Sequence, residues 1–103
     1  MNAAHLTEQA ARVRRAPTTI GKLWMVLLQA QRPMRRREVR QTLDAIMPAP
    51  IGPCALGDLL TESKRRGYLT AQGHPHRMEY AVTPACNVPP SIRLADVLEA
   101  VQS

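Results

Sequence analysis

Residues 56–70 read LGDLLTESKRRGYLT, and the spacing of apolar residues changes within this stretch. Its leucines at positions 56, 59 and 60 recur at the three- and four-residue intervals that place side chains on one face of a helix. Gly67 then occupies a position where glycine commonly ends a helix in the left-handed conformation. Beyond this glycine the chain is expected to be extended. The stretch therefore predicts a helix over residues 54–66 that passes directly into a short strand.

A helix with a wide apolar face is predicted near residues 20–32. Its apolar residues recur at intervals of three and four, and they are Ile20, Leu23, Trp24, Leu27 and Leu28. Thr18 or Thr19 is placed to cap its N-terminus. We expect it to end near Arg32, because Pro33 disfavours helical geometry at the preceding residue.

Residues 34–47 predict a second helix, with Val39 and Leu43 on its apolar side. Its first turn carries three consecutive arginines, which is electrostatically unfavourable beside the positive end of a helix dipole and hints at an external anion. Residues 1–17 end in RRAP and form either a short amphipathic helix or a basic arm. Prolines between positions 48 and 53 exclude a continuous helix there.

A β-hairpin is predicted after the helix over 54–66. Residues 68–70 are expected to be extended, residues 71–76 have turn chemistry, and apolar and polar residues alternate over 77–83. Ser91 is then expected to cap a last helix, whose apolar side would carry Leu94, Val97, Leu98 and Val101. These residues are candidates for a homodimer interface, and the alternative is that this helix packs back on the first one.

Three helices followed by a hairpin resemble a winged helix-turn-helix domain. Residues 32–39 (RPMRRREV) are similar to the segment that opens the second helix of that family, and residues 56–70 look like its recognition helix running into the first wing strand. Residues 77–84 (RMEYAVTP) look like the second wing strand. The resemblance implies a mainly α fold with a small β-hairpin: a winged helix-turn-helix domain over residues 18–86, flanked by the N-terminal segment 1–17 and a C-terminal helix in residues 87–103. Ser63, where the family more often has an apolar residue, is a departure.

The positive charge is concentrated in one part of the chain. The 103 residues carry a net charge of +6, but the segment from Arg12 to Arg40 holds nine basic residues and one acid, a net charge of +8, and the remainder carries −2. Twelve of the fourteen basic residues are arginines, whose planar fork suits phosphate and guanine edges. A nucleic-acid partner is therefore the first hypothesis.

The family resemblance implies binding to double-stranded DNA, with the third helix in the major groove. Carried onto this chain, the base-reading candidates are Ala55, Asp58, Thr61, Glu62, Lys64 and Arg65. The phosphate-binding candidates are Arg35, Arg36, Arg37 and Arg40, and the wing candidates are His74, His76 and Arg77. The function expected is sequence-specific DNA binding by a small bacterial or phage transcriptional regulator that acts as a homodimer.

Other functional classes find less support in the sequence. We find no catalytic constellation, no cofactor motif and no set of ligands at metal-binding spacing, so neither an enzyme nor a metal site is expected. Cys54 and Cys86 have no CxxC spacing, and no apolar run is long enough to cross a bilayer, which favours a soluble cytoplasmic protein without a membrane partner. The alternatives are a winged-helix adaptor with a protein partner and a non-specific nucleic-acid binder.

Overall fold

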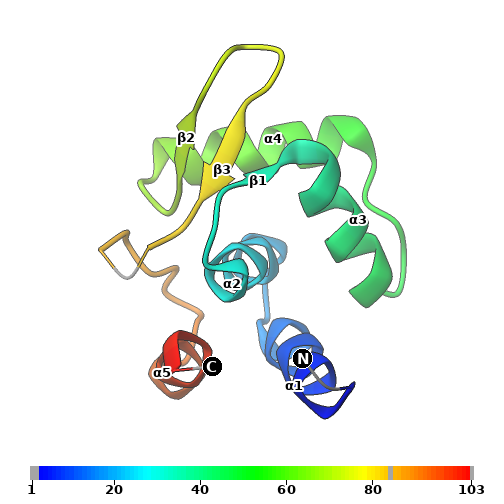
Figure 1. The fold of residues 1–103 in the computed structure, drawn as a ribbon, viewed down its shortest axis with the longest axis vertical. Helices are drawn as coiled ribbons and strands as arrows, with labels where there is room; N and C mark the ends of the chain where they lie inside the picture. The colour runs from blue at the N-terminus through cyan, green and yellow to red at the C-terminus, as the bar shows by residue number, and fades with distance from the viewer. Residues whose placement is uncertain (1–2, 84, 103) are drawn as a thin grey trace.

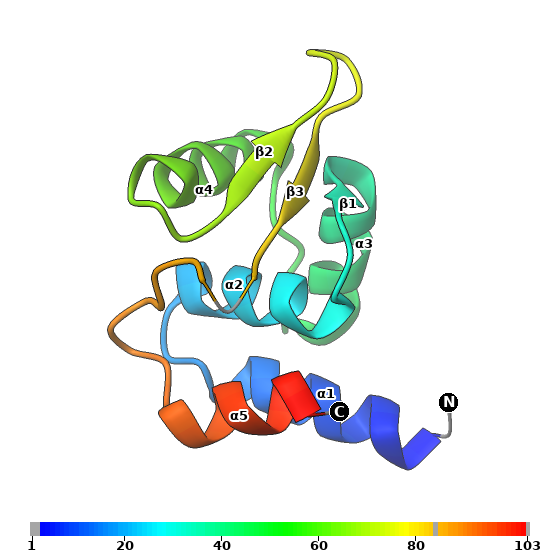
Figure 2. The same cartoon turned by 60° about the vertical axis from the view of Figure 1, so that its left-hand side comes forward.

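The computed structural model describes residues 3–83 and 85–102, and its helices are arranged in three layers around α2 (Thr19–Ala30) (Figure 1). Figure 2 shows α1 (Ala3–Arg15) and α5 (Leu94–Gln102) side by side below α2. Above it lie α4 (Pro53–Arg65) and a three-stranded antiparallel sheet, and α3 (Arg36–Ile46) runs from the level of the sheet down beside α2. The described chain is therefore mainly helical with a small sheet, as predicted.

The helix α2 forms the centre of the core, because six consecutive side chains from Leu23 to Leu28 are buried. A helix covered on both sides has no need of a polar face, which explains this apolar run. Of the two threonines expected to cap it, Thr18 does so: its hydroxyl accepts a hydrogen bond from the N–H of Gly21 at 3.0 Å. The helix ends slightly earlier than expected, because Gln31 adopts the left-handed conformation with a φ of 54°.

The prediction of a helix over residues 34–47 was wrong at its start. Met34–Arg35 form the strand β1, which pairs antiparallel with β3 (Glu79–Ala81), and α3 begins only at Arg36. The pairing places Met34 opposite Tyr80 and buries the methionine side chain. The carboxylate of Glu38 accepts the N–H of Arg35 at 3.2 Å, so the helix cap falls one residue after the expected start.

The helix α4 and its termination at Gly67 are as predicted, with the helix bounds shifted by one residue. Gly67 has a φ of 77°, its N–H donates to the carbonyl of Lys64 at 3.0 Å, and the N–H of Tyr68 donates to that of Ser63 at 2.9 Å. These two bonds are the Schellman arrangement that closes many helices. The side chain of Ser63 is buried, and its hydroxyl has no hydrogen-bond partner in the described part of the chain.

The predicted hairpin is present, but its strands occupy different residues. The strand β2 covers Thr70–Gln72, partly where a turn was expected, and β3 is shorter than the expected strand over 77–83. Ala71 pairs with Tyr80, and Gly73 opens the turn with a φ of 104°. Pro84, which ends the segment similar to a wing strand, lies outside the described residues. The strand order is β1-β3-β2, so β3 joins the hairpin to the segment before α3.

The two terminal helices close the other side of α2. The N-terminal segment forms α1 rather than an extended arm. The last helix starts at Leu94 and not after Ser91, whose hydroxyl instead lies 3.3 Å from that of Thr18. One side of it packs back on α2, and the predicted homodimer remains a prediction for the other side. Its predicted apolar side is divided: Val97 is buried at 8% exposure, whereas Leu94, Leu98 and Val101 are 71%, 51% and 43% exposed.

Candidate nucleic-acid interface

Positive side chains gather in a concavity of about 240 Å³ between the N-terminal end of α3 and the tip of the β2–β3 hairpin. The residues that line it, which we call the arginine groove, are Arg35, Arg36, Arg37, Pro75, His76, Arg77, Met78 and Tyr80. Four of them are arginines, and none of them is acidic. An anion with several oxygen acceptors is the ligand that such a lining favours.

The strand pairing brings the two halves of the groove together. Arg35 lies opposite Glu79 in the β1–β3 register, so this arginine and the two that open α3 meet the hairpin residues that follow its turn. Within the turn, the N–H of Arg77 donates to the carbonyl of His74 at 2.7 Å. Three of the four predicted phosphate-binding residues and two of the three predicted wing residues thus line one concavity, although they are about forty positions apart in the sequence.

Arg36 also has a structural role that the sequence did not reveal. Its guanidinium donates a hydrogen bond to the carbonyl of Pro53, in the first turn of α4, and lies over Gly57. A Cβ atom at Gly57 would be 2.9 Å from the Arg36 Nη2, so the guanidinium lies directly against the backbone of this glycine. Arg36 therefore connects the arginine groove to the start of α4.

One predicted phosphate-binding residue and one predicted wing residue lie outside the groove lining. Arg40 is 3.8 Å from the carboxylate of Asp44 on the same helix. His74 lies beside His76, with ring centroids 5.5 Å apart, and its Nδ1 accepts the N–H of His76 at 3.3 Å. Among the described residues, no three His, Cys, Asp or Glu side chains gather as a metal ion would require.

An ion pair joins Arg32, which precedes β1, to Glu38 in the first turn of α3. The guanidinium of Arg32 is 2.8 Å from the carboxylate of Glu38, and this hydrogen bond raises the pKa of Arg32. The pKa of Glu38 is lowered by the same bond and by the N–H of Arg35. An ionised carboxylate in the first turn is favourable beside the helix dipole. It offsets part of the unfavourable charge of the neighbouring arginines.

The exposed face of α4 carries the predicted base-reading residues. Those that are exposed are Ala55, Asp58, Thr61, Lys64 and Arg65. Glu62 is half-buried, and its carboxylate accepts hydrogen bonds from Arg65 at 2.6 and 3.0 Å and from Arg66 at 2.6 Å. These bonds lower the pKa of Glu62 to about 2. The positive charge at the end of α4 is therefore partly neutralised within the protein.

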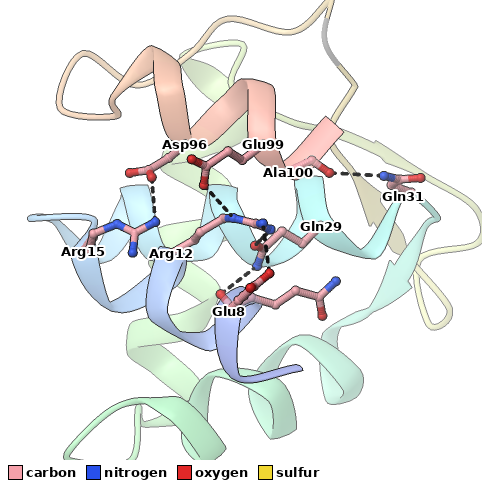
Figure 3. Close-up of polar contacts among 9 residues, drawn as sticks. Glu8, Arg12, Arg15, Gln29, Gln31, Asp96, Glu99 and Ala100 are labelled. Carbon is pink, nitrogen blue, oxygen red and sulfur yellow. Dashed lines mark hydrogen bonds and ion pairs between the residues drawn. The ribbon is translucent and has the colours of Figure 1, made fainter. Parts of the chain in front are cut away.

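Much of the basic segment from Arg12 to Arg40 is also used internally (Figure 3). Arg12 has a side chain only 7% exposed, with its guanidinium 3.4 Å from Glu99 and 3.2 Å from the amide oxygen of Gln29. Arg15 is 2.7 Å from Asp96. These contacts join α1 to α5 and α2, so the net charge of +8 overstates the positive charge available to a partner.

Comparison of the chain with protein-family models, curated proteins and solved structures found no match. In the described part of the chain, no helix has the length and apolar character to cross a membrane.

Proposed function

We propose that this chain binds double-stranded DNA, with phosphates in the arginine groove and the exposed face of α4 against the bases. The observation that carries the proposal is the convergence of Arg35, Arg37 and Arg77 from separate elements on one hollow without a lining acid. The order of α2, α3 and α4 followed by the hairpin supports a winged helix-turn-helix fold for this region.

The position of the groove favours a duplex over an isolated phosphate compound. Arg36 lines the groove and also contacts the first turn of α4, so the groove adjoins that helix. A backbone phosphate bound there would bring the next part of a duplex towards α4, and arginine contacts with phosphate fix the register of many DNA-binding helices. The hairpin extends past α4 in Figure 2, which suits a second contact along the same duplex.

Fluorescence anisotropy with a labelled random 20-base-pair duplex at 50 and 200 mM salt tests the proposal. We expect binding at 50 mM that weakens steeply at 200 mM, because each phosphate contact releases counterions. Arg37→Gln should weaken binding and reduce the salt slope by about 1. The matched control is Arg93→Gln, an exposed arginine that immediately precedes α5, at the end of the molecule away from the hairpin (Figure 2).

Absence of binding at 50 mM salt would overturn the proposal and favour a protein-binding adaptor. An equal effect of the two substitutions would mean that the groove is not the contact surface.

We further propose that the exposed face of α4 selects the DNA sequence. Selection from a random duplex library should yield an enriched site, and Arg65→Ala should weaken binding to that site by about 1–3 kcal/mol more than to random DNA. Recovery of no enriched site would leave non-specific nucleic-acid binding as the function.

We also propose a homodimer through the exposed side of α5. Leu94, Leu98 and Val101 are the exposed large apolar residues of this helix, and they are spaced almost evenly about Leu98. A two-fold axis at Leu98 would place Leu94 of one copy against Val101 of the other and set the helix dipoles antiparallel. Leu98→Glu should lower the mass seen by sedimentation equilibrium to that of a monomer. A monomeric mass for the unsubstituted chain at about 100 μM would exclude the dimer.

A further inference from the structure

The carboxylate of Glu62 holds two arginines at once at the C-terminal end of α4. Arg65 approaches it with two nitrogen atoms, at 2.6 and 3.0 Å, and the Nε of Arg66 lies at 2.6 Å. The other acid on the exposed side of this helix, Asp58, forms no ion pair with a described residue. We call the three residues Glu62, Arg65 and Arg66 the Glu62 clamp.

We propose that the Glu62 clamp lowers the affinity of the chain for non-cognate DNA by occupying two arginines that would otherwise bind phosphates. This inference rests on the DNA binding proposed above. Non-specific affinity is the sum of many contacts between cations and phosphates, so it falls when cations are already paired. A phosphate oxygen must compete with the carboxylate for the Nε and Nη2 donors of Arg65 and for the Nε donor of Arg66, and the carboxylate's negative charge opposes its approach to the remaining donors.

The clamp remains intact under neutral conditions. The two arginines lower the pKa of Glu62 to about 2, so the carboxylate is ionised throughout the neutral range. The planar guanidinium of Arg65 presents Nε and Nη2 as a pair of donors, and the two carboxylate oxygens of Glu62 accept one hydrogen bond from each. A correctly placed guanine edge offers the same fork two acceptors, so a cognate site can compensate for the lost carboxylate. Glu62 therefore acts as a residue that favours specificity rather than as a direct base contact.

The test compares Glu62→Gln with Asp58→Asn. Each substitution removes one negative charge from α4, but only the first releases arginines. We expect Glu62→Gln to tighten binding to a random 20-base-pair duplex by about threefold to tenfold more than Asp58→Asn does, from the usual strength of two exposed ion pairs. Its salt slope should be steeper by about 1 to 2, since one or two additional phosphates are bound.

The clamp is also observable without DNA. The side-chain Nε–Hε resonances of Arg65 and Arg66 should be resolved and slow to exchange in the unsubstituted protein, and both should broaden in Glu62→Gln but not in Asp58→Asn. Unchanged resonances in Glu62→Gln would overturn the clamp. Equal tightening by the two substitutions would overturn its effect on DNA and leave DNA binding itself in place, whereas failure of every variant to bind at 50 mM salt would overturn both proposals.

Discussion

In the ion pair between Arg15 of α1 and Asp96 of α5, only the aspartate is buried. Their side chains are 2.7 Å apart, with Arg15 42% exposed and Asp96 only 9% exposed. Replacing Arg15 with alanine would leave an ionised carboxylate at a buried position, with no other hydrogen-bond partner among the described residues. Replacing Asp96 with asparagine would leave a guanidinium that water can solvate. The two substitutions should therefore have unequal effects on stability.

The size of the difference follows from the burial of each group. Removing one partner of a fully buried ion pair lowers the free energy of unfolding by about 3–5 kcal/mol. Because Arg15 is half-exposed and water can reach this pair, we expect a loss of about 2 kcal/mol for Arg15→Ala. The loss for Asp96→Asn should be about 1 kcal/mol, since it combines a solvent-accessible ion pair with an acid in the first turn of α5. The double variant should be more stable than Arg15→Ala alone, because it no longer buries an unpaired charge.

Urea unfolding followed by tryptophan fluorescence measures these differences. Trp24 is the only tryptophan, it is buried in α2, and both α1 and α5 pack on that helix. All three variants should unfold at lower urea concentrations than the unsubstituted chain. The midpoint should be highest for Asp96→Asn, lower for the variant with both substitutions and lowest for Arg15→Ala. Equal losses for the two single variants, or a larger loss for Asp96→Asn, would refute the argument that the buried partner determines the cost.

Three further effects are expected on stability. Gly67→Ala should cost about 1–2 kcal/mol, because its φ of 77° is unfavourable for a residue with a Cβ. Gly52→Ala should cost less, about 1 kcal/mol or below, because a Cβ there meets open space and only the preference for glycine over alanine at the N-cap of α4 is lost; thermal melts of the two variants compare them. Ser63→Ala should raise the free energy of unfolding by about 1 kcal/mol, since it removes a buried hydroxyl without a partner, and urea unfolding that shows a loss would contradict this. The lowered pKa of Glu62 means that its stabilising effect is complete above its ordinary pKa of 4.5 and is lost as the pH falls towards about 2. Melting temperatures between pH 5 and 2 should therefore fall less steeply for Glu62→Gln, and parallel curves would exclude this contribution.

The elements that local patterns determine were predictable. The leucine spacing of α4 and the glycine at its end are sufficient for the helix and its termination, because both depend on residues within one or two turns. The strand β1 was not predictable in this way. Its two residues adopt extended geometry because they pair with β3, more than forty positions later in the sequence, and without that partner the same residues are compatible with the first turn of a helix.

The use of the arginines could not be predicted from their number. Arg12 and Arg14 are separated by one position, yet the first is buried among groups from α2 and α5, and the second is exposed. A helix places such neighbours on different faces, and only the packing of α5 decides which face meets an acid. Charge counts along a sequence therefore overestimate the positive surface wherever a later helix supplies the counter-charges.

The strand pairing, and not the helix dipole, is what favours an anion at the start of α3. Three arginines in one helical turn would be a local electrostatic cost, but Arg35 precedes the helix, and Glu38 stands in the first turn as a favourable acid. What favours an anion is instead the arrival of Arg77 from the hairpin beside Arg35 and Arg37. Like charges held together by a strand pairing repel one another, and a bound phosphate would relieve that repulsion. The hairpin is thus as necessary to the proposed contact as the arginine cluster itself.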